Sequence, residues 1–398
     1  MRIGIDFGIS NSYVACCSQL HTPDDPPVDS SSEVVSRLES LSTPNFVSIT
    51  SEGQVIVGEA SKRNQFSLEG NTIYDVKRMF GLTFSQVNKQ FKNSRENCRD
   101  SLWPFTFVQD QTNPEKPFIC VLVNGEEKKY SPEQVSALLL GHLKKTAEEH
   151  LNCTVSEVTI TVPAYFNDAQ RQATMDAGYI AGFEQIDLLN EPTAAALAYK
   201  QKDPSSIGQR VLVFDFGGGT LDVSIADIRN EDVILVATGG DCFLGGADLD
   251  RVLVQYCLEK FCNEKRIDIN NLGDVSNHKI AELRHEVEVA KQELSTAMEA
   301  GVNVASFLFD HDLEVTLTRK ELESECDFIF QKCLTTIDEI LDTAGLSEDS
   351  IDVVLTVGGS SLIPRIRQLV NNKFPGKSRS SVKADVAIAF GAAAYHLL

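Results

Sequence analysis

The stretch LVFDFGGGTLDV, residues 212–223, decides the fold. An apolar run ends in Asp215, a glycine-rich turn follows, and a second apolar run continues the chain, which is the pattern of two strands joined by a tight turn. Residues 3–14, IGIDFGISNSYV, repeat this unit with Asp6 aligned to Asp215, 209 residues earlier. A repeat separated by about half of the chain indicates two related lobes rather than a solenoid, whose repeats are short.

Strands alternate with helices along the rest of the chain, which predicts an α/β fold. Strands are expected at 157–162, 210–214, 222–228, 232–237 and 351–357, and a short apolar run lies at 186–190. Helices are expected at 131–150, 168–182, 249–262, 279–299, 320–344 and 362–373, and around Ala194–Ala198. The helix after Ser131 has a clear start signal, because Ser131 is a good N-cap and Pro132 stands at the first helical position. Residues 21–32 are rich in Pro, Asp and Ser and predict a solvated loop.

Composition excludes several classes of protein. A chain of 398 residues suggests two domains or lobes, and 42% hydrophobic residues can form a large core. No apolar run of about 18 residues is present, so no membrane span is expected. With 36 basic and 57 acidic residues the net charge is −21, which leaves no electrostatic footprint for nucleic acid or an anionic membrane.

The ten cysteines favour a reducing compartment. None forms a C-x-x-C motif, and the pairs Cys257/Cys262 and Cys326/Cys333 have no metal-ligand spacing with a partner histidine. Met1 leads directly into an apolar segment that ends at Asp6, without the layout of a secretory signal. We therefore expect a cytoplasmic protein.

The glycine-rich turn after Asp215 carries the main chemical signal. Gly217, Gly218 and Gly219 leave backbone N–H groups able to approach an anion, and Thr220 adds a hydroxyl. Asp215 and the nearby Asp222 are carboxylates of the kind that holds Mg²⁺ beside phosphates. The turn alone is equally compatible with a plain hairpin, but its second copy at Asp6–Gly8 favours phosphate binding. Neither a P-loop nor a dinucleotide-binding G-x-G-x-x-G is present.

Three further features are ambiguous when taken alone. Lys77 is a surface charge or, in a phosphate site, a group that offsets negative charge. Glu288, Lys291 and Ser295 form a polar stripe on a predicted helix, and such a stripe is usually a solvated face. Gly358 and Gly359 allow close approach to a ligand or form an ordinary strand–helix turn.

Five stretches together resemble the ATPase domain of the 70-kilodalton heat-shock chaperones, in the actin-like ATPase superfamily. They are VPAYFNDAQRQATMDAG (162–178), LLNEPTAAALAY (188–199), VFDFGGGTLDVSI (213–225), FLGGADLD (243–250) and VGGSSLIP (357–364). The resemblance covers nearly the whole chain. It implies two duplicated lobes, each with a large and a small subdomain, around a central nucleotide cleft. The implied boundaries are 1–204 for lobe I (core 1–44 and 131–204, small subdomain 45–130) and 205–398 for lobe II (core 205–244 and 326–398, small subdomain 245–325).

The resemblance also assigns roles to individual residues. Asp6 and Asp215 match the metal-water carboxylates, Lys77 the catalytic lysine, and Glu191 the glutamate near the attacking water. The matching phosphate and nucleotide contacts are Gly8, Ile9, Ser10, Gly217, Gly218, Gly219, Thr220, Gly245, Gly246, Asp248, Glu288, Lys291, Ser295, Gly358, Gly359, Ser360 and Asp385. Pro163 and Arg171 match the residues that relay the nucleotide state to the substrate-binding half. The implied cofactors are ATP or ADP with Mg²⁺, with K⁺ as a further candidate.

The chain also departs from the family pattern. Ile9 and Ser10 stand where the first loop usually has two threonines. Gln292 and Leu362 replace two arginines that sandwich the adenine, contacts worth about 0.5–2 kcal/mol each. Asp187 reverses the charge of the arginine that contacts J-domain co-chaperones, which argues against stimulation by a conventional J-domain. Met175 replaces the usual lysine after the QRQAT segment.

Three functions follow from this pattern. The first is a chaperone-type ATPase that hydrolyses ATP slowly and couples its nucleotide state to protein folding. The second is a catalytically weak or silent scaffold or co-chaperone that binds nucleotide structurally, which the departures favour. The third is a small-molecule kinase of the same fold, against which the long chaperone-type stretches argue. Expected partners are ATP and a nucleotide-exchange factor, with no nucleic acid or membrane, and the domain is expected to be a monomer.

Overall fold

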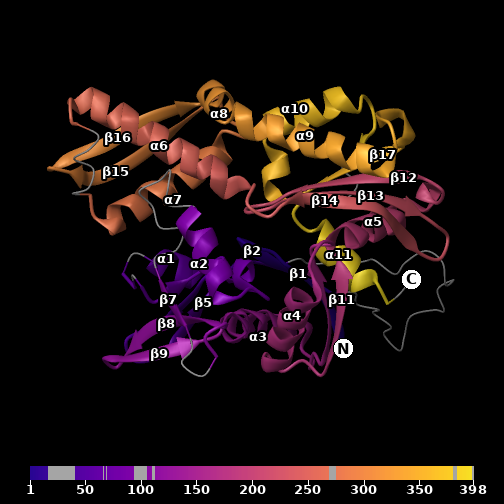
Figure 1. Ribbon diagram of the computed structural model, residues 1–398, viewed down its shortest axis with the longest axis horizontal. Coiled ribbons are helices and arrows are strands. Elements are labelled where there is room, and N and C mark those ends of the chain that lie inside the picture. Colours follow the sequence, from indigo (N-terminus) through magenta and orange to yellow (C-terminus); the bar gives the residue numbers. More distant parts are fainter. Residues whose placement is uncertain are drawn as a thin grey trace. The chain divides into compact units, whose positions relative to one another are not determined.

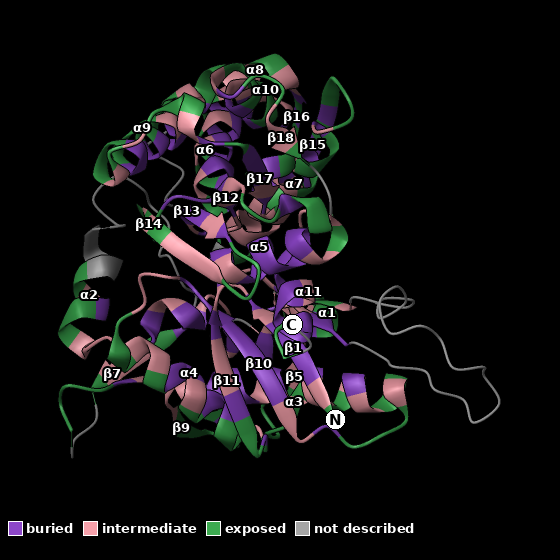
Figure 2. Cartoon of the chain, turned by 90° about the vertical axis from the view of Figure 1, so that its right-hand side faces the viewer, coloured by how far each residue is buried: buried purple, intermediate pink, exposed green. Residues whose placement is uncertain are grey.

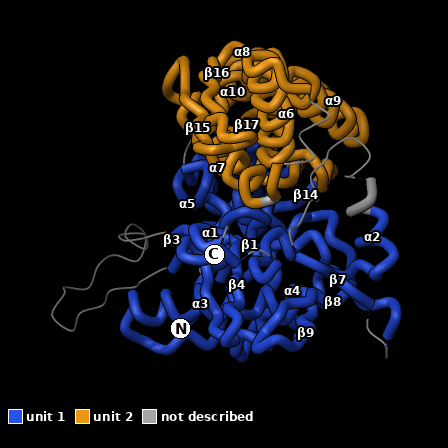
Figure 3. The backbone as a smooth tube through the Cα atoms, turned by 90° about the vertical axis from the view of Figure 1, so that its left-hand side faces the viewer, with its two compact units in different colours: residues 1–211, 226–235, 380–398 blue, residues 212–225, 236–379 orange. Residues whose placement is uncertain are grey.

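The computed structural model describes residues 1–16, 41–65, 67–68, 70–93, 105–109, 113–268, 275–379 and 383–396. These residues divide into two compact units (Figure 3). Unit 1 comprises residues 1–211, 226–235 and 380–398, and unit 2 comprises residues 212–225 and 236–379. The loop expected at 21–32 lies outside the described residues, as do Cys17 and Cys98. The subdomain boundaries expected above stay a prediction.

A five-stranded sheet forms the centre of unit 1, in the order β11-β10-β1-β2-β3. Its strands are β1 (Arg2–Phe7), β2 (Asn11–Ala15), β3 (Leu41–Pro44), β10 (Glu157–Val162) and β11 (Gln185–Asn190). The first half of the repeat forms the antiparallel pair β1–β2, and β1, β10 and β11 run parallel. β1 and β10 are buried along most of their length, as is typical of parallel strands covered on both faces (Figure 2).

Helices cover both faces of this sheet. Gly4 faces α11 (Ala387–Ala394), whereas Ile160, opposite Ile5, faces α4 (Asp168–Ile180). Because neighbouring residues of a strand point to opposite faces, the two helices lie on opposite sides. α5 (Glu191–Lys202) packs on α11, and α3 (Pro132–Leu151) packs on α4. The predicted start of α3 is confirmed, because Ser131 and Gln134 form a reciprocal capping box.

The described residues between 45 and 130 in unit 1 form two small sheets and three short helical segments. The first sheet has the order β5-β4-β6, and the second has the order β7-β8-β9. Their strands are β4 (Val47–Ile49), β5 (Val55–Val57), β6 (Thr72–Ile73), β7 (Thr106–Gln109), β8 (Pro117–Val123) and β9 (Glu126–Tyr130). The helical segments are α1 (Glu59–Asn64), the 3-10 turn η1 (Val76–Met79) and α2 (Phe84–Asn93). η1 carries Lys77 and so brings this region to the end of β1.

A second five-stranded sheet, ordered β14-β13-β12-β17-β18, contains the other half of the repeat. Its strands are β12 (Arg210–Phe216), β13 (Leu221–Ile228), β14 (Val233–Asp241), β17 (Val353–Val357) and β18 (Ser378–Arg379). The repeat hairpins β1–β2 and β12–β13 occupy equivalent places in the two sheets. The strand order therefore confirms the predicted duplication of the two central sheets.

The other elements of unit 2 are helices and one long hairpin (Figure 1). They are α6 (Gly246–Lys265), α7 (Asn277–Glu293), β15 (Glu299–Leu308), β16 (His311–Thr318), α8 (Arg319–Glu325), α9 (Asp327–Ala344), the 3-10 turns η4 (Glu348–Ser350) and η5 (Gly359–Leu362), and α10 (Pro364–Lys373). No helix among the described residues has the length and apolar character needed to span a bilayer. The α/β class predicted from the sequence is confirmed.

Two predicted helices were wrong in extent. The helix expected at 279–299 ends at Glu293, and Ser295 lies in the turn that follows. Arg319 stabilises this end, because its guanidinium donates to the Leu294 and Ala297 carbonyls at 2.8 Å each. β15 then begins at Glu299.

The helix expected at 320–344 is broken at Cys326 into α8 and α9. Cys326 has φ −98° and ψ 7°, outside the helical range. Its N–H still bonds the Leu322 carbonyl at 3.1 Å, and its own carbonyl accepts from Ile329 at 3.0 Å. Cys326, whose side chain is fully buried, is therefore both the C-cap of α8 and the N-cap of α9.

Candidate functional site

Three charged groups meet at the end of β1 in unit 1. The Lys77 ammonium donates to a Glu191 Oε1 atom at 2.9 Å and to the Phe7 carbonyl. The two side chains are only 5% and 7% exposed. Glu191 is the first residue of α5, and Asp6 lies on the sheet face that α5 and α11 cover. The structure therefore brings together three predicted site residues that are far apart in the sequence.

Asp6 is electrostatically perturbed by this arrangement. Burial and the negative charge of Glu191 raise the pKa of Asp6 to about 7, against the opposing effects of Lys77 and of a hydrogen bond from the Thr161 hydroxyl at 3.3 Å. With all three groups charged, Asp6, Glu191 and Lys77 carry one net negative charge. Such a cluster favours either a proton on Asp6 or a nearby cation.

The first turn, Gly8–Ser10, is held from behind by Asn45. Its side-chain amide donates to the carbonyls of Gly8 and Ile9 at 2.8 and 3.2 Å, and its backbone N–H donates to the Ser10 carbonyl at 2.9 Å. In a trans peptide the N–H points opposite to the preceding carbonyl. The N–H groups of Ile9 and Ser10 therefore point away from Asn45.

The second turn, Gly217–Thr220, is held in the same manner by the start of α6. The N–H groups of Gly246 and Ala247 donate to the carbonyls of Gly217 and Gly218 at 3.0 and 2.8 Å. By the same peptide geometry, the N–H groups of Gly218 and Gly219 point away from α6. This close packing requires glycine, since a Cβ on Gly245 would lie 2.4 Å from the Gly219 Cα.

Several other predicted residues of unit 2 gather around this second turn. Gly358 has φ +82°, and a Cβ there would lie 2.5 Å from Asp215 Oδ1. A Cβ on Gly246 would lie 2.6 Å from Ser360 Oγ and 3.2 Å from the Lys291 ammonium. Asp215, Gly217–Thr220, Gly246, Lys291 and Ser360 thus form one cluster at the carboxyl ends of β12 and β17.

Lys291 has a buried acidic partner that sequence reasoning missed. Its ammonium bonds Asp250 at 2.7 Å and the Gly246 carbonyl at 3.0 Å, and both charged side chains are 11% exposed. Burial raises the pKa of Asp250, while Lys291 opposes that rise. The pair fixes the Lys291 head group against the first turn of α6.

Other predicted residues are placed less tightly. Asp248 caps α6 by accepting from the Gly245 N–H at 2.8 Å, and Gly359 begins η5. Glu288 lies on α7 with Lys291, whereas Ser295 has left the helix. Asp385 belongs to unit 1, before α11, where its charge helps to raise the pKa of the largely buried Tyr13.

Arg171 connects the segment after β10 to the end of β11. Its guanidinium donates to the carbonyls of Phe166 and Ala164 at 2.9 and 3.2 Å and to Asn190 Oδ1 at 2.8 Å. Asn190 directly precedes Glu191, so Arg171 ties this segment to the charged cluster. Asn45, Thr161 and Asp250 were missed because each acts through a partner far away in sequence, and no local pattern marks such residues.

The family of the chain follows from a comparison with models of known protein families. The family model described as Hsp70 protein matches residues 2–396 of this chain. The chain therefore belongs to the Hsp70 family of chaperones and has its actin-like ATPase fold. Members of this family generally bind ATP or ADP with Mg²⁺ and hydrolyse ATP.

Proposed function

We propose that this Hsp70-family chain binds Mg-ATP and Mg-ADP and slowly hydrolyses ATP, and that its nucleotide state drives lobe closure and protein folding. One observation carries the proposal. At the end of each repeat strand, an aspartate is followed by a turn whose carbonyls are held from behind, by Asn45 in one unit and by α6 in the other. Both turns therefore present adjacent N–H groups, which is the geometry that binds phosphate oxygens.

The residues present fit Mg²⁺. The cluster of Asp6, Glu191 and Lys77 carries an excess negative charge that a divalent cation would neutralise. Burial and the charge of Glu191 raise the pKa of the Asp6 carboxyl, so a cation there would be favourable. Mg²⁺ typically keeps several waters and takes one or two carboxylates, so the absence of a larger acidic cluster among the described residues is compatible with it. Asp6 and Asp215 would hold it through water. When bound, it neutralises charge developing on the phosphates.

The chain's own residues position the reaction. Glu191 orients the attacking water, and Lys77, fixed by Glu191 and the Phe7 carbonyl, offsets charge on the γ-phosphate. Thr220 adds a hydroxyl beside the second turn. Phosphoryl transfer depends mainly on such positioning and charge neutralisation. Glu288, Lys291 and Ser295 would contact the adenosine, and Ser360 would complete the nucleotide site.

The second candidate is a silent or weakly active scaffold. Ile9 places a hydrocarbon side chain where the first turn of the family usually has a hydroxyl. Gln292 and Leu362 are exposed but lack the guanidinium groups that would stack on an adenine. The held carbonyls of the first turn argue against this reading, because the backbone N–H of Ile9 keeps its direction whatever its side chain. Side-chain changes reduce affinity without removing the backbone donors.

Titration calorimetry with Mg-ATP and Mg-ADP, followed by single-turnover hydrolysis, separates the two candidates. Thr220→Val keeps the shape of the side chain and removes the hydroxyl, so the hydrolysis rate should fall while the fold persists. Thr335→Val, at an exposed position on α9, is the matched control and should hydrolyse like wild type. Binding without hydrolysis in wild type would favour the scaffold, and no binding would refute both candidates.

Partners and compartment follow as further proposals. Asp187 forms ion pairs with Arg2 and with His396. An acidic side chain therefore lies at the position where the family has the arginine that contacts a J-domain. We expect that a conventional J-domain does not stimulate the hydrolysis of ATP. We also expect that a nucleotide-exchange factor binds the chain and that the domain is a monomer. No disulfide joins any of the eight described cysteines, which suits the cytoplasm.

A further inference from the structure

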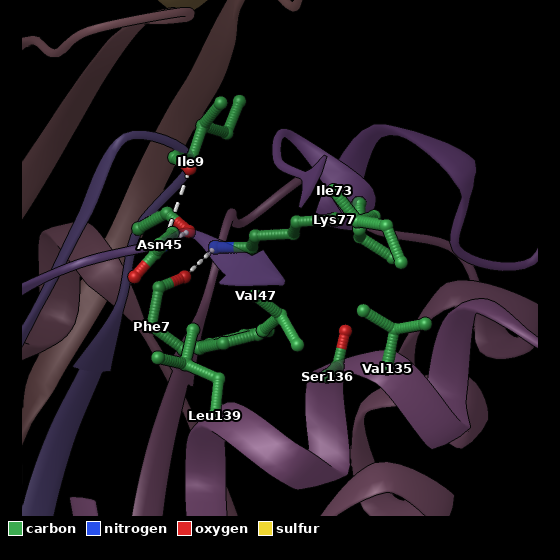
Figure 4. Close-up of a pocket in the computed structure, with 11 residues that line it drawn as sticks. Phe7, Ile9, Asn45, Val47, Ile73, Lys77, Val135, Ser136 and Leu139 are labelled. Atoms are coloured by element: carbon green, nitrogen blue, oxygen red, sulfur yellow. Dashed lines mark hydrogen bonds between the residues drawn. The ribbon is translucent and has the colours of Figure 1, made fainter. Parts of the chain in front are cut away.

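A small cavity lies beneath the side chain of Lys77, wholly within unit 1 (Figure 4). Apolar side chains such as Val47, Val135 and Leu139 form most of its wall. Lys77, Asn45 and Ser136 supply its polar groups, and Figure 4 shows the Ser136 hydroxyl directed into the space below Lys77. The volume open to the centre of a water molecule is about 20 Å³. A water needs about 10–15 Å³ by this measure, so one or two fit.

Two buried oxygen atoms of this wall have no hydrogen-bond partner among the described residues. They are Ser136 Oγ and Asn45 Oδ1, on side chains that are 3% and 8% exposed. The orientation of the Asn45 amide is settled, because its nitrogen donates to the carbonyls of Gly8 and Ile9. Its oxygen is therefore an acceptor that needs a donor. Unpaired polar atoms in a dry cavity would cost about 1–3 kcal/mol each.

The polar groups of the cavity favour water over a metal cation or an anion. The Lys77 ammonium has three protons, of which the Phe7 carbonyl and Glu191 accept two. A metal cation is disfavoured in the cavity because its lining includes the Lys77 ammonium and no carboxylate, and an anion is disfavoured by the Asn45 acceptor and the apolar wall. Water can donate to Asn45, exchange a hydrogen bond with Ser136 and accept from Lys77. Buried waters typically make two to four such bonds.

We infer that this cavity is a buried water site and that its one or two waters bridge Ser136 to Asn45. The bridge holds the Asn45 side chain, whose amide in turn holds the carbonyls of Gly8 and Ile9. Ser136 and Asn45 are therefore positioning residues for the first phosphate-facing turn. The site itself is independent of the proposed function, whereas its effect on hydrolysis rests on that function.

A high-resolution crystal structure tests occupancy directly. The expected result is a density peak about 2.7–3.2 Å from Ser136 Oγ or Asn45 Oδ1. Xenon under pressure gives a second reading, because dry apolar cavities take up xenon whereas a water-filled one does not. A xenon peak in the cavity and no water peak would overturn the inference.

Stability measurements distinguish a bridged hydroxyl from an unpaired one. If Ser136 binds water, Ser136→Ala should lower the midpoint of thermal unfolding by a few degrees. Ser206→Ala is the matched control, because Ser206 is fully buried in unit 1 with an unpartnered hydroxyl but does not line the cavity. The control midpoint should be unchanged or higher. An unchanged or higher unfolding midpoint in Ser136→Ala would contradict a water bridge.

The positioning role has its own readout. Ser136→Ala should lower the single-turnover rate about 3- to 10-fold while leaving the Kd for Mg-ADP unchanged, as expected for the loss of one hydrogen bond behind the turn. An occupied site with a wild-type rate would overturn the positioning role. A wild-type chain that shows the water but hydrolyses no ATP would refute the proposed function and leave the water site standing.

Discussion

Lys77→Met tests the charged cluster through stability rather than activity. Methionine keeps much of the length of lysine but leaves Glu191 and Asp6 without a cation. Lys77 and Glu191 form a pair 2.9 Å apart with side chains 5% and 7% exposed. Removing one partner from such a buried pair costs about 3–5 kcal/mol, because the other charge stays buried and uncompensated. We therefore expect the free energy of unfolding of unit 1 to fall by about that amount.

The loss should depend on pH with a defined sign. The pKa of Asp6 is about 7 in the fold against 3.8 in the unfolded chain, so the folded state binds more protons and wild-type stability falls as pH rises from about 4 to about 7. Lys77 acts to lower this pKa, so the variant moves it above 7. The deficit relative to wild type should accordingly be larger at about pH 8.5 than at about pH 6.

Denaturant unfolding followed by circular dichroism at both pH values measures this effect. Lys145→Met is the matched control, since Lys145 pairs with Glu149 on the surface at 3.7 Å with side chains 75% and 68% exposed. Such a pair contributes about 0–1 kcal/mol. The double variant Lys77→Met/Glu191→Gln should recover part of the loss. A Lys77→Met loss no larger than that of the control, or equal at both pH values, would refute the reasoning.

Four other substitutions have defined outcomes. Gly391→Ala should strongly destabilise unit 1, because a Cβ there would lie 1.8 Å from the Ala194 carbonyl oxygen. Gly141→Ala, at a helical position with open space around it, should instead stabilise unit 1 by about 0.5–1 kcal/mol. Thermal unfolding measures both effects. Arg319→Ala should cost about 1.5–3 kcal/mol in denaturant unfolding, because it removes charged hydrogen bonds from the two carbonyls after α7, and a cost near zero would contradict that role. Leu362→Arg should raise Mg-ADP affinity about 2- to 30-fold in calorimetric titration if adenine binds there, and an unchanged Kd would place the adenine elsewhere.

The repeat could be predicted from the sequence because its signal is local. An apolar strand, an aspartate and a glycine turn occur together in both copies, and the structure places both hairpins at the centres of their sheets. The start of α3 was equally legible, since Ser131 and Pro132 act within one turn of the chain. Features of this kind depend on neighbouring residues alone.

The long-range partners were not predictable from these patterns. Lys77 and Glu191 meet across 114 residues, and Lys291 meets Asp250 across 41. The early end of α7 has the same origin, because the guanidinium that binds the two carbonyls just after the helix comes from Arg319, beyond the β15–β16 hairpin. Tertiary contacts of this kind override the local helical pattern.

Single-turnover hydrolysis of ATP in the presence of Mg²⁺, run on wild type and on Thr220→Val at saturating protein, tests the central claim most directly. The account predicts one nucleotide bound per chain, slow release of phosphate by wild type, and a lower rate in the variant at unchanged stability. Nucleotide that stays intact on wild type would contradict the ATPase. Equal rates in wild type and Thr220→Val would contradict the part given to the Gly217–Thr220 turn.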